Sequence, residues 1–246
     1  SRHSARQNAV HDMIDRLRSS LLWSWGLLLF GVMGLIMLFW LIFFKPERYE
    51  PWMRRACRWF LRALGVRLRL VDHGGRQANG VYLFLANHVN NLDPFVFKAA
   101  LPQSFCAMES ADHFRWPLYG WLIHRLGHIP IERERPFRAM GSLAAAIKAL
   151  QNGASLLIFP EGSRTRDGKL LPFKRGAFHL AQTAGVDIVP VLQRGSFAVN
   201  NKVDGRLRPG EIKVEILPPL RYVEFAMMDS RQLREMVRKK MREALE

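Results

Sequence analysis

The 246-residue sequence contains few cysteines and few acidic residues. Its two cysteines, Cys57 and Cys106, lie in different segments, so they form neither a metal-ligand pattern nor a disulfide framework, and we interpret both as free thiols in a reducing compartment. The 21 Asp and Glu residues are outnumbered by 37 Lys and Arg residues, giving a net charge of +16. This charge favours an anionic partner: nucleic acid, anionic lipid, a phosphorylated substrate or an acidic carrier protein.

Several common functional motifs are missing as well. The sequence has no Walker loop, no dinucleotide-binding glycine fingerprint and no nucleophile elbow. His124 and His128 have i,i+4 spacing, but Gly127 interrupts them and no carboxylate cluster accompanies them, so we predict no metal site. With 49% hydrophobic residues and no internal repeat, the chain is predicted to fold around one main core.

One long hydrophobic run is present, from Leu21 to Phe44, and it contains no charged residue. As a helix it reaches about 36 Å, enough for a hydrocarbon layer of about 30 Å. Residues 45–48 (Lys-Pro-Glu-Arg) stand where a signal peptide would have a small-residue cleavage site, so we predict a membrane-embedded helix. Both flanks are basic: the positive-inside rule leans toward a cytoplasmic C-terminal side, and a helix that dips into the bilayer and returns is equally compatible.

Residues 51–64 interleave arginines with Trp52, Trp59 and other apolar side chains. This pattern is typical of a basic amphipathic helix at a lipid headgroup interface, and the alternative is an ordinary surface helix with solvated arginines. Binding of RNA would need a recognition motif, which is absent. We therefore divide the chain into an N-terminal membrane-associated helical segment, residues 1–65, and a second domain, residues 66–246.

The second domain alternates strand and helix patterns, which predicts an α/β fold with a largely parallel or mixed sheet flanked by helices. We expect strands at 66–71, 81–86, 104–108, 128–132, 154–159, 188–192 and 212–217. We expect helices at 93–101, 116–126, 137–151, 175–184 and 229–245, and a loop over 195–210. Polar motifs follow three of these strands: Asn87 to Asp93, Arg133, and residues 160–164. Ligands of open α/β sheets bind beyond the carboxyl ends of strands, so these motifs mark a candidate site.

His88 and Asp93 are the candidate catalytic residues. A neutral imidazole can accept a hydroxyl proton, and a carboxylate on its other nitrogen fixes the tautomer and stabilises the imidazolium. Asp93 precedes Pro94, so the alternative is that it caps a helix. The turn of Glu161, Gly162, Ser163 and Arg164 can approach and grip a phosphate, and Lys174 extends its basic surface. Arg133 lies in the charge run 132–135, where solvated side chains are the alternative.

The ordered set of motifs resembles the glycerolipid acyltransferase family. Asn87-His88 to Asp93 is similar to its NHx4D motif, and Phe159 to Arg164 is similar to its FPEG(T/S)R motif. Residues 127–133 and 189–191 resemble the second and fourth motifs, and residues 173–177 also fit. One departure is Asn90, where the family often has Ser.

The resemblance implies the family's α/β fold and an acyltransferase in phospholipid biosynthesis. The acyl donor would be an acyl-carrier protein or acyl-CoA thioester, and no other cofactor is expected. The acceptor would be 1-acylglycerol-3-phosphate or another lyso-lipid such as lyso-ornithine lipid. His88 would be the base, Asp93 its orienting group, and Arg133, Glu161, Gly162, Ser163, Arg164 and Lys174 would bind or enclose the acceptor. We expect the enzyme on the inner membrane, with its site facing the cytoplasm and no nucleic-acid partner. The competing hypothesis is a non-catalytic membrane-anchored binder of anionic lipid or nucleic acid.

Overall fold

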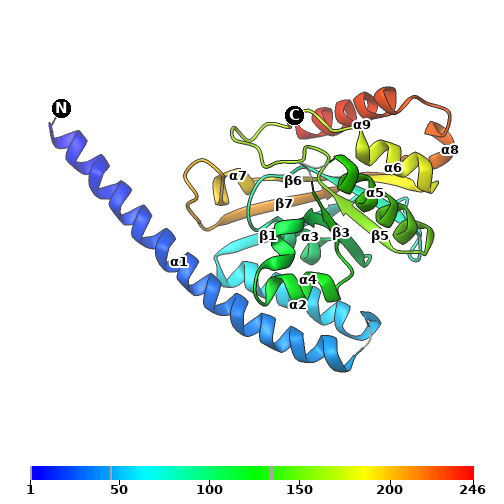
Figure 1. The fold of residues 1–246 in the computed structure, drawn as a ribbon. Helices are drawn as coiled ribbons and strands as arrows, with labels where there is room; N and C mark the ends of the chain where they lie inside the picture. The colour runs from blue at the N-terminus through cyan, green and yellow to red at the C-terminus, as the bar shows by residue number, and fades with distance from the viewer. Residues whose placement is uncertain (1, 45, 133–135) are drawn as a thin grey trace.

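The computed structural model describes residues 2–44, 46–132 and 136–246, which form a three-layer α/β/α domain preceded by two long helices (Figure 1). The strands are β1 (Val66–Asp72), β2 (Tyr82–Ala86), β3 (Phe105–Ser110), β4 (Ile129–Ile131), β5 (Ser155–Ile158), β6 (Asp187–Arg194) and β7 (Gly210–Ile216). The helices are α1 (Arg2–Phe43), α2 (Pro46–Ala63), α3 (Asp93–Ala100), the 3-10 helix η1 (Ala111–Arg115), α4 (Tyr119–Arg125), α5 (Pro136–Gln151), α6 (Gly176–Ala184), α7 (Ser196–Val199), α8 (Tyr222–Phe225) and α9 (Ser230–Leu245).

In the described residues the strands form one mixed sheet in the order β1-β7-β6-β2-β5-β3-β4. Every neighbouring pair is parallel except β6 and β7. Only a short helix and turns join β6 to β7, without the crossover that a parallel pair needs, so this pair is antiparallel. The predicted α/β fold with helices on a mixed sheet is therefore confirmed. The predicted division at residue 65 falls on the turn between α2 and β1.

Two hydrophobic cores lie on opposite faces of the sheet. Strand β2 is buried on both sides, and its side chains alternate between the cores: Phe84 packs into the core under α1, α2 and α3, whereas Leu83 and Leu85 pack into the core under α5, α6 and α9. Because β2 lies in the middle of the sheet, the loop that follows it is held between both layers. This loop carries His88 and Asp93.

Two local expectations were wrong, and one helix was not predicted. The helix expected over 116–126 begins only at Tyr119, because Pro117 and the left-handed Leu118 (φ +62°) separate it from η1. The loop expected over 195–210 contains α7, and α8 was not predicted. Both helices are four residues long, too short for a periodic apolar pattern to reveal them.

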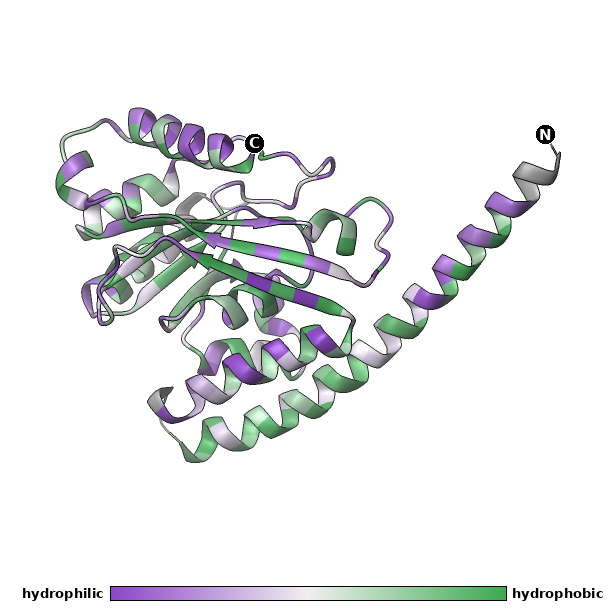
Figure 2. Ribbon diagram, turned by 180° about the vertical axis from the view of Figure 1, so that it is seen from behind, coloured by the Kyte–Doolittle hydropathy of each residue, from purple (hydrophilic) through white to green (hydrophobic). Residues whose placement is uncertain are grey.

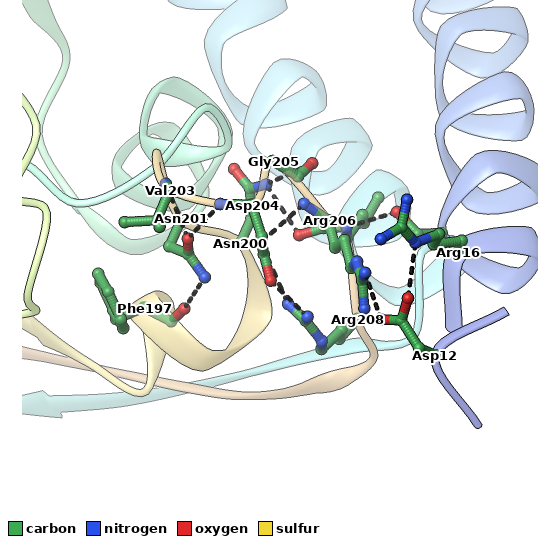
Figure 3. Close-up of polar contacts among 12 residues, drawn as sticks. Asp12, Arg16, Phe197, Asn200, Asn201, Val203, Asp204, Gly205, Arg206 and Arg208 are labelled. Atoms are coloured by element: carbon green, nitrogen blue, oxygen red, sulfur yellow. Dashed lines mark hydrogen bonds and ion pairs between the residues drawn. The ribbon is translucent and has the colours of Figure 1, made fainter. Parts of the chain in front are cut away.

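Helix α1 extends well beyond the predicted apolar run, and the α7–β7 loop holds its first half (Figure 3). The Asp12 carboxylate accepts hydrogen bonds from Arg16 at 2.8 Å and from Arg206 at 2.5 Å. Further along the helix, the Ser19 hydroxyl accepts from the Leu207 backbone N–H at 2.9 Å, and the Trp23 indole donates to the Gly205 carbonyl at 3.0 Å. The loop between α7 and β7 thus fixes α1 against the domain.

The second half of α1 packs against α2 and α4. Gly34 permits a close approach, because a Cβ at this position would lie 2.8 Å from the Leu118 side chain. Near the end of the helix, Arg125 donates to the Leu41 carbonyl at 2.8 Å. Over the described residues one helix, Gln7–Phe43, is long and apolar enough to cross a membrane, and Figure 2 shows its largely hydrophobic second half.

Candidate active site

The candidate residues meet at one edge of the sheet. Strands β2, β5 and β6 are parallel neighbours, so their carboxyl ends point the same way. The loop after β2 carries His88 and Asp93, the turn after β5 carries Glu161 to Arg164, and Gln193 lies near the end of β6. A hydrogen bond from the Thr165 backbone N–H to the His88 carbonyl, 3.1 Å long, joins the first two segments.

His88 and Asp93 form a close pair. The His88 Nδ1 lies 2.6 Å from the Asp93 Oδ2, and the aspartate is fully buried whereas the histidine side chain is 20% exposed. The Asp93 carboxylate also accepts from the backbone N–H groups of Val89 (2.8 Å) and Asn90 (3.2 Å). Asp93 is the first residue of α3 and the N-cap position is Leu92, so Asp93 is not the helix cap. Its carboxylate instead holds the histidine loop.

Gln193 is a site residue that the sequence interpretation missed. Its side-chain amide donates to the Asp93 Oδ1 at 2.8 Å and to the Asn87 carbonyl at 3.1 Å. The Asn87 side chain in turn bonds both backbone groups of Gln193, donating at 3.0 Å and accepting at 2.8 Å. The Ser196 hydroxyl donates to the side-chain oxygen of Gln193 at 2.5 Å. Gln193 is only 2% exposed, so this network fixes Asp93 from the side opposite the histidine.

Asn90, where the sequence departs from the family motif, has a local structural role. Its side-chain oxygen accepts from the Leu92 backbone N–H at 2.8 Å, and its amide donates to the Ser196 carbonyl at 2.9 Å. The first bond closes the turn that brings Asp93 back to His88. The second ties the turn to α7.

Two residues of the turn after β5 act on His88 directly. The Phe159 ring stacks on the imidazole, with centroids 4.2 Å apart and planes 15° apart. The Glu161 carboxylate accepts from the backbone N–H groups of His88 (2.8 Å) and Leu171 (2.7 Å). Burial raises the pKa of Glu161 to about 7, with the nearby Asp93 charge adding to the rise and the two backbone hydrogen bonds opposing it. Glu161 therefore braces the histidine loop.

The rest of this turn presents a basic edge. Gly162 has φ +72°, a backbone conformation that favours glycine, and a Cβ there would displace the end of the exposed Lys174 side chain, which lies 2.7 Å away. Lys174 is exposed and its backbone N–H donates to the Pro160 carbonyl at 2.8 Å. Arg164 donates to the Asn91 side chain, and Ser163 is exposed. Lys174 and Arg164 thus lie beside the histidine loop.

Arg133 lies outside the described residues, but the strand before it is held firmly. Strand β4 pairs with β3, and His128 just before β4 contacts Glu109 of β3 at 2.8 Å. Burial alone would raise the pKa of Glu109, but hydrogen bonds from His113, His128 and Tyr119 lower it to about 2. The Glu109 carboxylate therefore anchors the end of β3, η1 and the start of β4 together.

This arrangement is suited to proton abstraction. The carboxylate takes the His88 Nδ1–H, which leaves Nε2 as the nitrogen that accepts a proton. The buried, fully hydrogen-bonded Asp93 stabilises the imidazolium that results. A mixed α/β sheet with a histidine–aspartate pair at its edge and cationic side chains nearby is an arrangement suited to an enzyme that activates a hydroxyl group near an anion.

Comparisons with known proteins place the chain more closely. The acyltransferase family model matches residues 68–194, about half of the sequence, so the chain belongs to the acyltransferase family. A 1-acyl-sn-glycerol-3-phosphate acyltransferase from Salmonella typhimurium is 36% identical over 157 residues, covering 63% of this chain and 62% of that protein. One from Limnanthes douglasii is 33% identical over 156 residues, covering 63% of this chain and 54% of that protein. The chain thus spans little more than half the length of the plant relative.

The fold is shared with a solved structure. The crystal structure of the 1-acyl-sn-glycerophosphate acyltransferase PlsC from Thermotoga maritima superposes with a TM-score of 0.82, covering 94% of this chain and 96% of that one. The two sequences are 21% identical. The similarity includes the N-terminal helices, because the matched region is longer than the sheet domain alone.

Proposed function

We propose that this protein transfers a fatty acyl group from a thioester to the free hydroxyl of 1-acylglycerol-3-phosphate, giving phosphatidic acid. The observation that carries the proposal is the His88–Asp93 pair, 2.6 Å apart, whose His88 backbone donates to the Glu161 carboxylate and accepts from the Thr165 N–H at the two ends of the basic turn. The relatives' names supply the acceptor. A non-catalytic binder would have no use for a buried carboxylate that orients a histidine.

The reaction proceeds by direct transfer. His88 Nε2 removes the proton of the acceptor hydroxyl while the hydroxyl oxygen attacks the thioester carbonyl. The tetrahedral intermediate collapses with cleavage of the carbon–sulfur bond, and the leaving thiolate takes the proton from the His88 imidazolium. Asp93 holds the imidazole throughout. Both atoms and charge balance with the two substrates alone, so the mechanism needs no metal or other cofactor and no acyl-enzyme.

The basic edge binds the acceptor phosphate in this proposal. Arg164 and Lys174 supply the charge, and Gly162 allows the backbone to approach. Arg133 and Ser163 complete the predicted set. Glu161 has a different role, since both of its carboxylate oxygens accept backbone hydrogen bonds and a carboxylate repels phosphate. It shapes the pocket by holding the His88 loop.

Helices α1 and α2 attach the enzyme to the membrane. Exposed apolar side chains form a stripe along α1 at helical spacing, namely Val10, Ile14, Leu17, Leu21, Trp25, Leu28, Val32, Leu35, Phe39 and Ile42. The opposite face of the same helix contacts the domain from Asp12 to Leu41. A helix held along its length cannot cross the bilayer while the domain stays in water. We therefore favour an α1 that lies in one leaflet of the inner membrane, with the site facing the cytoplasm.

The donor is acyl-CoA or an acidic acyl-carrier protein, and the excess of basic residues favours either one. The test is thiol release from a long-chain acyl thioester by the detergent-purified chain, with 1-acylglycerol-3-phosphate or lyso-ornithine lipid as acceptor. We expect release with the glycerophosphate. Release only with lyso-ornithine lipid would reassign the acceptor, and no release with either would favour the non-catalytic binder.

The phosphate role of Arg164 has its own control. Arg164→Gln should raise the acceptor KM at least about tenfold, because a charge-assisted hydrogen bond contributes about 1.5–3 kcal/mol. Arg231→Gln, which removes the same charge from an exposed position on α9, should leave the KM unchanged. Equal KM values for the two variants would contradict the role of Arg164.

A further inference from the structure

Helix α2 has two faces with different environments. Its inner face is buried under α3 and the sheet and includes Met53, Cys57 and Phe60. Two of its arginines are engaged there: Arg54 donates to carbonyls just after α3, and Arg58 donates to the Ala99 carbonyl at 2.9 Å. The outer face alternates tryptophan and arginine at helical spacing, as Trp52, Arg55, Trp59 and Arg62. The outer tryptophans are 52% and 56% exposed.

An open groove of about 420 Å³ runs between this outer face and α1. That volume is within the range of small-molecule sites. The lining is largely apolar, with one arginine and three tryptophans whose indole N–H groups are donors, and consists of Leu29, Val32, Met33, Ile36, Met37, Trp40, Trp52, Arg55, Ala56 and Trp59. Both walls are α-helices, whose backbone groups bond within each helix, so besides the indole N–H groups the groove offers one charged group and apolar contact.

Arg55 is the charged group at this groove. Its guanidinium lies over the Trp52 ring, 5.2 Å from the centroid, and Trp52 stacks on Trp40 of α1. Among the described residues no carboxylate forms a salt bridge with Arg55, in contrast to the buried pair of Lys98 and Glu50 on the inner side of α2. The stacked Trp52 holds the guanidinium at the rim of the groove, where its N–H donors can meet an anion.

We propose that this groove binds an anionic phospholipid, with one acyl chain lying between α1 and α2 and the phosphate on Arg55. A ligand with a single anionic group joined to a long apolar chain matches this lining of one charged group amid apolar side chains. An extended peptide would bring backbone N–H groups for which the side chains of the walls offer no strong acceptor. A second copy of the chain, packed through its own apolar stripe, would leave Arg55 without an anion.

The groove is separate from the candidate active site. Its lining comes only from α1 and α2 and includes neither the His88 loop nor the turn after β5. The proposal shares with the proposed function only the attachment of these two helices to the membrane. A bound lipid joins the two helices and stabilises the hairpin, so the lipid acts as a structural partner of the enzyme rather than as its substrate.

The experiment is native mass spectrometry of the full chain released from micelles that contain equal amounts of phosphatidylglycerol and phosphatidylcholine. No thioester is present, so the result does not depend on whether the protein transfers acyl groups. We expect one phosphatidylglycerol retained per chain in preference to phosphatidylcholine. Equal retention of the two lipids would overturn the proposal, and so would an apolar-stripe dimer that carries no lipid.

Two pairs of variants test the geometry. Arg55→Gln should weaken phosphatidylglycerol retention at least about tenfold, as expected for loss of a charge-assisted hydrogen bond. Arg62→Gln, on the same outer face but outside the groove, should weaken it by no more than about fivefold, the general attraction of one basic residue. Ala56→Phe should fill the groove and reduce retention, whereas Val10→Phe, on the stripe outside the groove, should not. Equal effects within either pair would contradict the site.

Discussion

Replacing Asp93 by Asn tests how this site orients its histidine. The Asp93 Oδ2 accepts from His88 and Val89, and the Oδ1 accepts from Asn90 and Gln193. An asparagine has one carbonyl oxygen, so its amide must face two of these four donors. If the amide takes the Oδ2 place, the His88 Nδ1 becomes an acceptor, and the proton moves to the nitrogen that should act as base. If it takes the Oδ1 place, the tautomer survives but the carboxylate charge is lost.

Both orientations have measurable costs. In the first orientation the Val89 N–H loses its acceptor, and in the second the Asn90 and Gln193 donors lose theirs. At about 1–3 kcal/mol for each buried donor, the free energy of unfolding should fall by about 1–6 kcal/mol. The transfer rate should fall about 10⁴-fold, as found when the aspartate of another enzyme's histidine–aspartate pair is changed to asparagine. The assay is acceptor-dependent thiol release beside thermal unfolding, with Asp112→Asn as an exposed control. A rate for Asp93→Asn within about tenfold of that control would show that transfer does not depend on the Asp93 carboxylate.

Three further predictions concern the groups around the pair. Gln193→Leu should lower the rate at saturating substrate by about tenfold and leave the acceptor KM unchanged, because Gln193 positions Asp93 by one hydrogen bond. A change in KM alone, measured in the same thiol assay, would contradict that role. Gly162→Ala should lower the free energy of unfolding by more than about 1 kcal/mol, because φ +72° opposes a Cβ. Gly141→Ala, at an open position inside helix α5, should instead raise it by about 0.5–1 kcal/mol, and thermal unfolding that shows a Gly162→Ala protein as stable as the wild type would contradict the first expectation. Glu161 has a pKa of about 7 in the folded chain and so binds a proton more tightly when folded than when unfolded. Its contribution to stability is therefore full below about pH 4.5 and is lost as the pH rises to about 7, at up to about 1.4 kcal/mol per pH unit. Denaturant titration at several pH values should therefore show that the free energy of unfolding falls less with pH over this range for Glu161→Gln than for the wild type. Equal dependence on pH in the two proteins would exclude the raised pKa.

The histidine–aspartate pair could be predicted from the sequence because it is local. The two residues are five positions apart, and Asn90 supplies the turn between them from within the same loop. The meeting of this loop with the Glu161 turn was also predictable, since the carboxyl ends of parallel strands share one edge of the sheet. Sequence spacing was sufficient for both inferences.

Other features depend on contacts that no local pattern records. Gln193 reaches Asp93 from 100 residues away, and in the sequence it is only one polar residue at the end of an apolar strand. The structure assigns the Glu161 carboxylate to backbone groups, whereas the charge pattern alone grouped it with the phosphate-binding residues. The first half of α1 is fixed by loop residues nearly 200 positions away, such as Arg206 on Asp12, so the apolar run gave no indication of its full length.

Thiol release with 1-acylglycerol-3-phosphate shows whether His88 is the base for acyl transfer to a lyso-lipid hydroxyl. The rate is measured for the wild-type chain, His88→Ala and the control His179→Ala, an exposed histidine on α6. We expect the His88 variant to fold normally and to lose about 10²–10⁴-fold in rate, whereas the control keeps the wild-type rate. Wild-type turnover by a folded His88→Ala protein would exclude His88 as the base.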